Sequence, residues 1–415
     1  MARVEELQGL ASFDYTDPAM RGPAFHVALD RLRSQGWLAK GPYGFVVLDR
    51  EAGEHFLRSR NASFPGAAIA ELFQVQEGPL REEMRRNILH LNGADHSRLR
   101  SLLNPSLSPK AVQRHRPAMR ELLGALFDRM VADACVGQRL SRELVETITK
   151  PYPAEVIAQV MGAPLSDAPQ LNHWSQWIQR QFDAQSMIEQ RDQIEAAVAE
   201  FYEYADALLA ARRRQPGEDL ISMLLAAEEQ GDRLSEVECV NLVLNVLVGG
   251  VDTTQSQLAH ALRLFAEHPE QWEMLAREPE LAGQAVQETL RFEPVTPFSA
   301  RIVEQEIVFR DVTFPPGTIV MVCAFTGNRD LDGEVSAESF DIAADRPRAR
   351  NLTFGAGIHY CVGANLAQAE LEEALSFLAP RMRSLQLDGE PEYGSITGIY
   401  GLSCLPVSFE LASTA

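Results

Sequence analysis

One predicted helix constrains how this chain can fold. Ser235 is a preferred N-cap residue, and Glu238 stands three positions later, where a capping box places an acid. The helix that they begin is expected to run to about His268. It carries the apolar run Val240 to Val248, which is too hydrophobic for a helix on the surface. The rest of the chain is therefore expected to pack around this helix.

Two glycines interrupt the interior of this central helix. Gly249 and Gly250 directly follow the apolar run, and each costs roughly 1 kcal/mol relative to alanine in a helix. Without side chains they would let something bulky lie against the helix. Asp252 and Thr253 come next, and their side chains compete with the backbone for hydrogen bonds. We interpret the break as one wall of a binding site; the alternative is a core helix that is merely kinked.

Composition excludes several classes of protein. The chain has 415 residues, of which 46% are hydrophobic, so it can bury a large core. Its net charge of −20 argues against a general nucleic-acid binder and against binding to anionic membranes. The five cysteines form no CxxC pair, which is typical of a reducing compartment. Residues 1–20 contain no apolar run long enough for a signal peptide or membrane anchor, so we expect a cytoplasmic protein.

Helical periodicity dominates the middle of the chain, from about Ala111 to Leu290. Strands are expected afterwards at Ile302 to Arg310 and at Thr318 to Phe325, joined through a Pro-Pro-Gly turn. The segment from Gly398 to Leu411 is expected to form another strand pair. No linker or repeat separates these parts. We therefore expect one mainly helical domain with small β-sheets, covering residues 1–415.

A single cysteine, Cys361, lies in a glycine-rich loop before an apolar segment of helix formers, Leu366 to Leu378. A thiolate near a helix N-terminus is stabilised by unpaired N–H groups. Gly357 and Gly363 allow close backbone approaches, and His359 can donate a hydrogen bond to an acidic group beside the cysteine. The pattern favours a metal held by one axial sulfur against a flat cofactor. A buried structural cysteine is the alternative.

This loop resembles the haem-binding loop of the cytochrome P450 family. The family has a Phe, a Gly, a basic residue, the ligand Cys, a Gly and Leu-Ala at these spacings, which here are Phe354, Gly355, His359, Cys361, Gly363 and Leu366-Ala367. The resemblance implies one haem b per chain with Cys361 as the thiolate ligand of the iron. It also implies the triangular prism fold of that family, which is mainly α with small β-sheets. It covers most of the chain, from His96 to the C-terminus.

The glycine break also resembles a family motif, Ala/Gly-Gly-x-Asp/Glu-Thr, where the central helix passes over the haem. By this resemblance Gly249 and Gly250 would lie against the cofactor. Thr253 would hydrogen-bond dioxygen, and Asp252 would supply protons towards it. Gly249 replaces the alanine of many relatives and could widen the groove.

Four basic positions match the family's ligands for the haem propionates. The segment with His96 and Arg100 resembles a His-x-x-x-Arg motif, in which the intervening Arg98 would point elsewhere. Arg301 matches the arginine after the family's ExxR helix, and His359 matches the basic residue before the cysteine. An arginine is suited to this task because its planar guanidinium can bond a carboxylate through two nitrogens.

The ExxR motif itself is Glu288 and Arg291, which lie on one helix face. Its place between the central helix and the strands matches a buried pair in the family, so we assign it to structure and not to catalysis. Asn351 departs from the histidine often found just before the haem loop, which leaves open what covers that edge.

The resemblance also indicates substrate contacts, which are Asn245, Val248, Pro297, Phe298 and Ile399. Mostly apolar walls with one amide predict a neutral, largely hydrophobic substrate, such as a terpenoid, a steroid or a secondary-metabolite intermediate. The segment from Phe64 to Leu91 is expected to form the lid of this pocket.

The resemblance also implies that electrons come from other proteins. The sequence has no GxGxxG after a strand for NAD(P) or flavin and no cysteine cluster for iron–sulfur ligation. We expect O2 as co-substrate, with a ferredoxin and a ferredoxin reductase as donors. Two basic runs predict the docking face: Arg98, Arg100, Lys110, Arg114, Arg116 and Arg120, and then Arg346, Arg348 and Arg350.

The sequence therefore predicts a haem-thiolate monooxygenase. A haem-thiolate peroxygenase or isomerase, which needs no external electrons, is one alternative; the intact pair of Asp252 and Thr253 argues against it. A haem-based gas sensor or carrier is the other. It would have no use for a proton-delivery pair and would normally carry a fused output domain.

Overall fold

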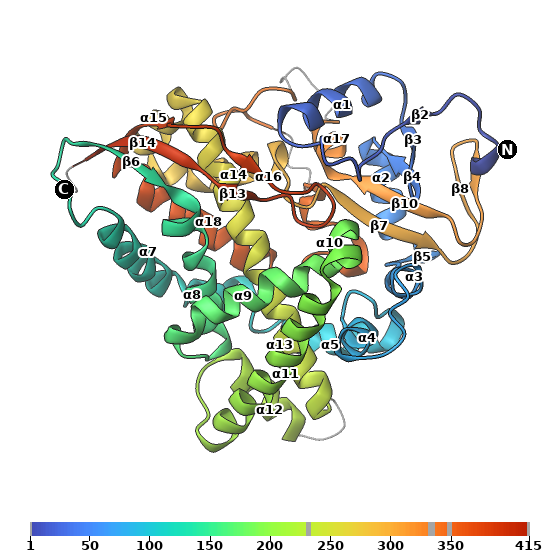
Figure 1. Cartoon of the computed structure of the whole chain (residues 1–415), viewed down its shortest axis with the longest axis horizontal. Coiled ribbons are helices and arrows are strands. Elements are labelled where there is room, and N and C mark those ends of the chain that lie inside the picture. Colours follow the sequence, from blue (N-terminus) through green and yellow to red (C-terminus); the bar gives the residue numbers. More distant parts are fainter. Residues whose placement is uncertain (1, 230–233, 331–336, 347–350, 413–415) are drawn as a thin grey trace.

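Helices dominate the computed structural model, which describes residues 2–229, 234–330, 337–346 and 351–412 (Figure 1). The helices are α1 (Pro23–Arg33), α2 (Arg50–Arg58), α3 (Gly66–Leu72), α4 (Pro79–Arg86), α5 (Gly93–Leu103), α6 (Pro109–Gln113), α7 (Arg116–Met130), α8 (Pro151–Met161), α9 (Ala168–Gln179), α10 (Ala184–Glu189), α11 (Arg191–Arg214), α12 (Leu220–Glu229), α13 (Glu236–Gly250), α14 (Asp252–Glu267), α15 (Pro269–Arg277), α16 (Ala282–Phe292), α17 (Ala324–Arg329) and α18 (Ala364–Leu378).

The strands form small sheets beside this helical body. They are β1 (Ala2–Arg3), β2 (Ala11–Ser12), β3 (Leu38–Gly41), β4 (Gly44–Val47), β5 (Ala62–Ser63), β6 (Arg139–Glu143), β7 (Phe298–Val303), β8 (Ile307–Phe309), β9 (Val312–Phe314), β10 (Ile319–Cys323), β11 (Met382–Leu387), β12 (Glu392–Tyr393), β13 (Leu402–Cys404) and β14 (Pro406–Leu411). The largest sheet has the order β2-β3-β4-β10-β7-β5, and the others are β1-β9-β8, β11-β14-β6 and β12-β13.

The predicted central helix is confirmed, with one interruption. The Ser235 side chain accepts from the Glu238 N–H and the Glu238 carboxylate accepts from the Ser235 N–H, which is the expected capping box. α13 ends at Gly250 and α14 begins at Asp252. Both helices contribute many fully buried side chains to the main hydrophobic core.

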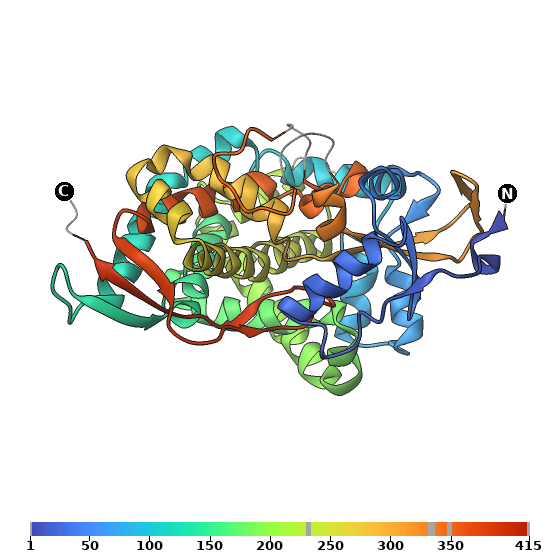
Figure 2. The same cartoon turned by 90° about the horizontal axis from the view of Figure 1, so that it is seen from above.

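Neighbouring helices surround α13 and α14. α8, α9 and α11 pack on α13, and α16 and α18 pack on α14. Figure 2 shows α14 running through the middle of the molecule between other helices. The span Glu236–Glu267 is long and apolar enough to cross a membrane, but 61% of its most apolar window is buried by the rest of the protein. Its hydrophobicity is therefore accounted for by its place in the core.

The strand predictions are right in type and wrong in several boundaries. The expected strand at 302–310 is divided between β7 and β8 by a turn, and the expected strand at 318–325 ends at Cys323, directly before α17. The predicted C-terminal pair forms two strands, β13 and β14, that do not pair with each other. β13 pairs with β12, whereas β14 lies between β11 and β6. Local patterns identified the extended segments, but partners far along the chain set their ends.

Glu288 and Arg291 are buried, as predicted, and a third residue joins them. Arg291 contacts the Glu288 carboxylate through Nε at 2.8 Å and Nη2 at 2.9 Å. Arg346 contacts the same carboxylate through Nε and Nη2, both at 2.8 Å. The triad links α16 to the segment before the cysteine loop. Arg346 is therefore not available for docking, which corrects that part of the predicted docking face.

Candidate functional site

Cys361 lies where the sequence predicted, at the start of α18. Its N–H donates to the Phe354 carbonyl at 2.9 Å, which closes the loop. Burial raises the pKa of the Cys361 thiol, while the N–H groups of Gly363 and Ala364 and the charge of Arg100 lower it. The expected stabilisation of a thiolate by the helix N-terminus is thus present, and binding to a metal would remove the remaining proton.

Gly357 shows why the loop contains glycine. Its φ is +72°, and a Cβ built there would lie 2.7 Å from the Leu57 carbonyl oxygen. Any side chain would push the loop away from α2. Gly355 also has a positive φ of 68°. Phe354 is half-buried and packs against the main core, with its ring 6.3 Å from that of Tyr360.

The four predicted basic residues converge beside this loop. His96 and His359 stack edge to face with ring centroids 4.6 Å apart. Arg100 donates to the Tyr360 carbonyl and Arg301 to the Ala300 carbonyl. Burial, together with the charges of Arg301, His96 and Arg100, lowers the pKa of His359 to about 3.

Arg301 is a buried cation with no carboxylate partner among the described residues. It is only 5% exposed, and burial alone lowers its pKa to about 10. No carboxylate of the described residues shifts the pKa of Arg301, His96, Arg100 or His359. A buried cation without an anion is costly. The cluster therefore fits a dianionic group, and haem with its propionates, held through the Cys361 sulfur, meets that requirement.

The two glycines of the central helix have different roles. A Cβ at Gly249 would meet no atom within 4 Å, so this residue borders open space, as expected for a cofactor groove. A Cβ at Gly250 would lie 2.4 Å from Ile157 Cδ1. On that side Gly250 packs closely against α8, and the predicted cofactor contact at this position stays a prediction.

Thr253 and Asp252 begin α14 beside that space. The Thr253 hydroxyl donates to the Gly249 carbonyl at 2.6 Å, which leaves its oxygen free to accept a hydrogen bond. Burial raises the pKa of Asp252 to about 6, against the opposing effect of the Arg180 charge. A carboxyl with this pKa can both take up and release a proton near neutral pH.

Arg180 is a site residue that the sequence did not reveal. Its guanidinium lies 4.2 Å from the centre of the Trp177 ring and donates to Gln190 at 2.8 Å. It belongs to a short helical turn, η4 (Arg180–Phe182), after α9. No local motif marks it, because the packing of α9 on α13 and α14 is what brings its charge close enough to lower the pKa of Asp252.

Three of the predicted substrate residues have side chains suited to an apolar wall. Val248 and Pro297 are buried, and Ile399 is half-buried in the C-terminal turn. Asn245 is half-buried, and its Oδ1 accepts from the Ile88 N–H at 3.0 Å.

Phe298 lies elsewhere, which corrects the prediction for that residue. Its ring packs against Phe13, Tyr15 and Phe25 in a separate aromatic cluster. Side chains alternate along a strand, so the even-numbered Phe298 faces away from the side of β7 that carries Arg301. Ser299, on the same face as Arg301, is the better candidate.

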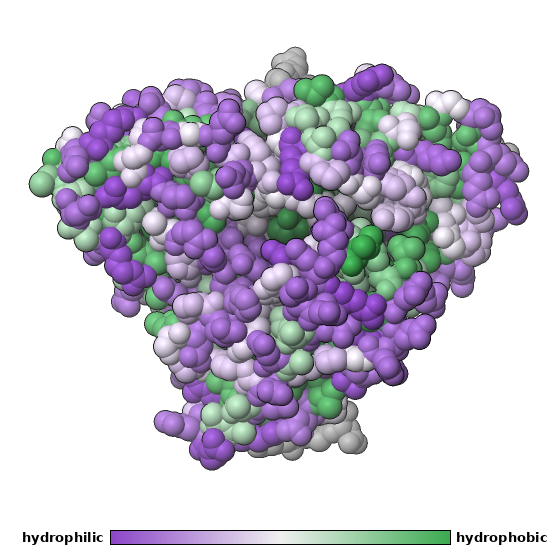
Figure 3. All heavy atoms as spheres, viewed as in Figure 1, coloured by the Kyte–Doolittle hydropathy of each residue, from purple (hydrophilic) through white to green (hydrophobic). Residues whose placement is uncertain are grey.

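The predicted lid contains α3 and α4, and α4 packs on α11. Leu72, at the end of α3, is 53% exposed, and Ile188 in α10 is 72% exposed. Figure 3 shows a mostly hydrophilic face on which hydrophobic side chains gather in the region of α3 and α10. The lid region is therefore one of the places on this face where apolar side chains reach the surface.

Several basic residues between His96 and Arg120 already form ion pairs with glutamates, so they are less available for docking than the sequence indicates. Arg98 pairs with Glu238 at 2.5 Å, away from the haem cluster as predicted. Arg116 pairs with Glu372 at 2.5 Å and Glu373 at 2.9 Å, and Arg120 also pairs with Glu373. Lys110 and Arg114 are exposed and form no ion pair among the described residues. The predicted contributions of Arg348 and Arg350 lie outside the described residues.

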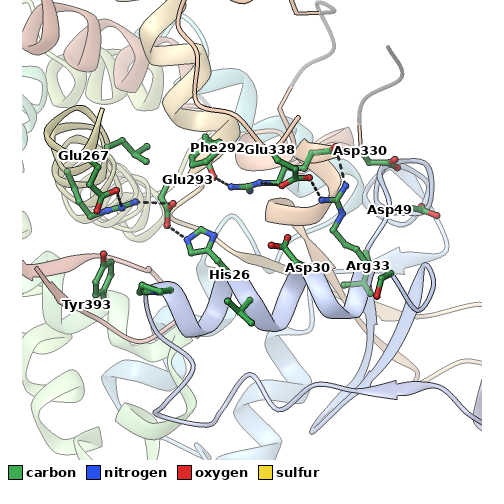
Figure 4. Close-up of a pocket in the computed structure, with 18 of the residues that line it drawn as sticks. His26, Asp30, Arg33, Asp49, Glu267, Phe292, Glu293, Asp330, Glu338 and Tyr393 are labelled. Atoms are coloured by element: carbon green, nitrogen blue, oxygen red, sulfur yellow. Dashed lines mark hydrogen bonds and ion pairs between the residues drawn. The ribbon is translucent and has the colours of Figure 1, made fainter. Parts of the chain in front are cut away.

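A polar cleft of about 1010 Å³ lies apart from the cysteine loop, between α1, α14 and α17 (Figure 4). His26 points at Glu293, with Nε2 and Oε1 3.2 Å apart, and Arg263 contacts the other carboxylate oxygen at 3.0 Å. On the opposite side Arg33 contacts Glu338 at 2.6 Å. Its charged walls pair mainly with each other, so we assign this cleft to structure.

Comparisons with known proteins agree with this geometry. The sequence profile of the cytochrome P450 family matches residues 38–379. Luteothin monooxygenase of Streptomyces thioluteus is 32% identical over 97% of each chain, and nocardicin C N-oxygenase of Nocardia uniformis subsp. tsuyamanensis is 34% identical over 74% of each chain. Among solved structures, CalO2 superposes with a TM-score of 0.87 at 28% identity, over 97% of this chain and 100% of that one.

This chain belongs to the cytochrome P450 family, and its fold is that of the family. Its relatives are named as monooxygenases and hydroxylases, and it is a haem-thiolate monooxygenase with haem b as cofactor and a cysteine as the axial ligand. Luteothin, nocardicin C and mycinamicin IV are the compounds in the names of three relatives.

Proposed function

We propose that this enzyme oxidises a neutral, mostly hydrophobic secondary-metabolite intermediate in the cytoplasm, as a single catalytic domain over residues 1–415. A terpenoid or a steroid has the same surface chemistry and is included in this class. The observation that carries the proposal is the apolar character of Val248, Pro297 and Ile399, which leaves the Asn245 amide as the polar group among the predicted contacts. Apolar walls with few polar groups bind such ligands and fix their orientation. Two relatives, luteothin monooxygenase and nocardicin C N-oxygenase, are named for a small organic molecule, which supports a small-molecule metabolite as the substrate.

The roles of the chain's own residues follow from their chemistry. When bound, haem supplies the activation of O2 and the insertion of one oxygen atom into the substrate, while the other leaves as water. Cys361 would hold it, and His96, Arg100, Arg301 and His359 would hold its propionates.

Proton management falls to the start of α14. Thr253 Oγ, whose hydrogen is donated to the Gly249 carbonyl, would accept a hydrogen bond in the space beside Gly249. Asp252 would pass protons from solvent, since a carboxyl with a pKa of about 6 exchanges readily near neutral pH. Arg180 would set the protonation and direction of that carboxyl. The peroxygenase and isomerase alternatives would have no need of this arrangement.

The electron donor in this proposal is a ferredoxin, itself reduced by a ferredoxin reductase. Lys110 and Arg114 carry the docking proposal, because they are exposed, basic and without ion pairs in the described part of the chain. Two cations on a protein with a net charge of −20 would steer an acidic partner to one place.

Spectral titration with a panel of candidate substrates is the decisive test. Polyketides, terpenoids, steroids and charged amino-acid derivatives would be added to the ferric protein. The haem absorption spectrum would report binding, because a ligand that displaces water from the iron changes its spin state. Neutral hydrophobic compounds should give the shift, and turnover with surrogate ferredoxin and reductase should follow. Binding confined to charged ligands would refute the proposed substrate class. Turnover with peroxide alone would refute the proposal that a ferredoxin supplies the electrons.

A further inference from the structure

Asn245 is the accessible residue in an otherwise buried stretch of the central helix. From Cys239 to Val248 every other residue of α13 is buried. One turn after Asn245, Gly249 is exposed, and one turn later Thr253 is partly exposed. Residues four apart share one face of a helix. Asn245 therefore borders the same open space as Gly249 and Thr253.

The spacing holds across the break at Val251, because helical hydrogen bonds continue through it. Val251 keeps right-handed helical dihedral angles, with φ −85° and ψ −68°. Its N–H donates to the Leu247 carbonyl at 3.1 Å, and its carbonyl accepts from the Gln255 N–H at 3.0 Å. Asn245 and Thr253 are thus two turns apart on one stripe, roughly 12 Å along the helix axis.

A backbone contact with the lid fixes the direction of the Asn245 amide. The Ile88 N–H, in the predicted lid segment, donates to Asn245 Oδ1 at 3.0 Å. A backbone N–H can only donate, so the amide atom that faces it must be the oxygen. The NH2 group of Asn245 is therefore turned away from this contact.

That NH2 group has no acceptor in the described part of the chain. Asn245 Nδ2 makes no hydrogen bond there, and the atom is not fully buried. Two nearby amides differ in this respect. Asn241, one turn earlier on α13, donates from Nδ2 to the Val237 carbonyl at 2.8 Å, and Asn87 donates to Glu83 at 2.6 Å. Of these three amides, Asn245 is the one that keeps a donor for a molecule in the open space.

We propose that Asn245 is a specificity-determining residue whose NH2 group donates to a neutral oxygen acceptor of the substrate, such as a ketone, an ester or an ether. The inference rests on the proposed function and narrows its substrate class to hydrophobic compounds that carry such an acceptor. Thr253 lies at the other end of the stripe, so the acceptor and the carbon that is oxidised lie at opposite ends of the substrate.

A hydrocarbon binds less well in this arrangement. Water that hydrates Nδ2 must leave when a ligand enters, and a ligand without an acceptor then leaves the donor unpaired. A carbonyl oxygen in the same place restores the hydrogen bond. The net contribution of one such bond corresponds to about a three- to tenfold difference in affinity.

Two neutral probes that differ in one carbonyl, 4-phenylcyclohexanone and phenylcyclohexane, test the proposal. Calorimetry on the haem-loaded, ferric full chain measures both affinities whether or not the spin state changes. Asn245→Leu keeps a similar volume without the amide. It should lower the ratio of ketone affinity to hydrocarbon affinity by about three- to tenfold, because only the ketone uses the NH2 group. In infrared spectra, the carbonyl band of the bound, isotope-labelled ketone should lie at lower wavenumber in the wild type than in this variant.

Ile88→Pro is the matched control, because it removes the lid contact and keeps the amide. The His90 N–H donates to the Asn87 carbonyl, so Ile88 is the second residue of a β-turn, and its φ is not positive. Proline is favoured at that place in such a turn. An amide that only held the lid would change both affinities equally, and the two variants would then behave alike. The proposal requires Ile88→Pro to keep the wild-type ratio.

The outcomes separate this inference from the proposed function. An Asn245→Leu ratio equal to that of the wild type would overturn the inference and leave the proposed function standing. An Ile88→Pro ratio as low as that of Asn245→Leu would do the same. A wild-type protein that binds neither probe would refute the proposed substrate class together with the inference.

Discussion

Replacing Glu288 by glutamine tests the structural role of the buried triad. The Glu288 carboxylate is 4% exposed and accepts five hydrogen bonds: two from Arg291, two from Arg346 and one from the Asp341 N–H. A glutamine has the same shape but presents one oxygen and an NH2 group to guanidinium groups that can only donate. The variant would therefore leave two buried cations without an anion.

The expected loss of stability is about 3–5 kcal/mol, because removing one partner of a buried ion pair leaves an uncompensated charge. A matched control is Glu82→Gln, which breaks an exposed pair with Arg85 at the same i, i+3 spacing, 38% and 64% exposed. Exposed pairs contribute only about 0–1 kcal/mol, so this variant should unfold almost as the wild type does.

Urea unfolding of both variants, followed by circular dichroism and by haem absorbance, measures the difference. The midpoint should fall strongly for Glu288→Gln and hardly at all for Glu82→Gln. A Glu288→Gln protein within about 1 kcal/mol of the wild type would show that the triad is not what holds α16 to the segment before the cysteine loop.

Other residues give sharper tests of chemistry. Cys361→Ser should lose the spectrum of the reduced carbon monoxide complex typical of a thiolate ligand, together with turnover; a variant that kept both would disprove the ligand assignment. Thr253→Ala should bind haem and ligands normally but release more peroxide per NAD(P)H consumed, and unchanged coupling would mean that another group delivers the proton. Arg114→Glu should slow reduction by ferredoxin at low salt without changing stability, whereas Arg116→Glu should also destabilise the fold, because Arg116 pairs with Glu372 and Glu373. If Arg114→Glu is reduced as fast as the wild type, this docking face is wrong.

Sequence patterns were most informative where the chemistry is local. Cys361, Gly357 and the start of α18 lie within one loop, so spacing alone defines their relation. The capping box of Ser235 and Glu238 is likewise a contact between near neighbours, and it was predicted correctly. The patterns failed where one residue type suits two environments. Phe298 has the apolar side chain of a pocket residue, but the alternation of side chains along β7 directs its ring into a separate aromatic cluster.

Charge is the clearest case of what only the tertiary structure decides. A run of arginines indicates a positive surface, yet Arg346 and Arg116 are neutralised by glutamates from distant helices, which only folding brings near.

The sequence by itself determined the family, the axial cysteine, the central helix and the basic residues beside the haem loop, because each depends on residue type at short spacing. The tertiary structure alone decided which charges are paired, which wall each strand residue faces, and that the charge of Arg180 acts on Asp252. These depend on the packing of α4, α9 and α14, whose contacts join residues far apart along the chain.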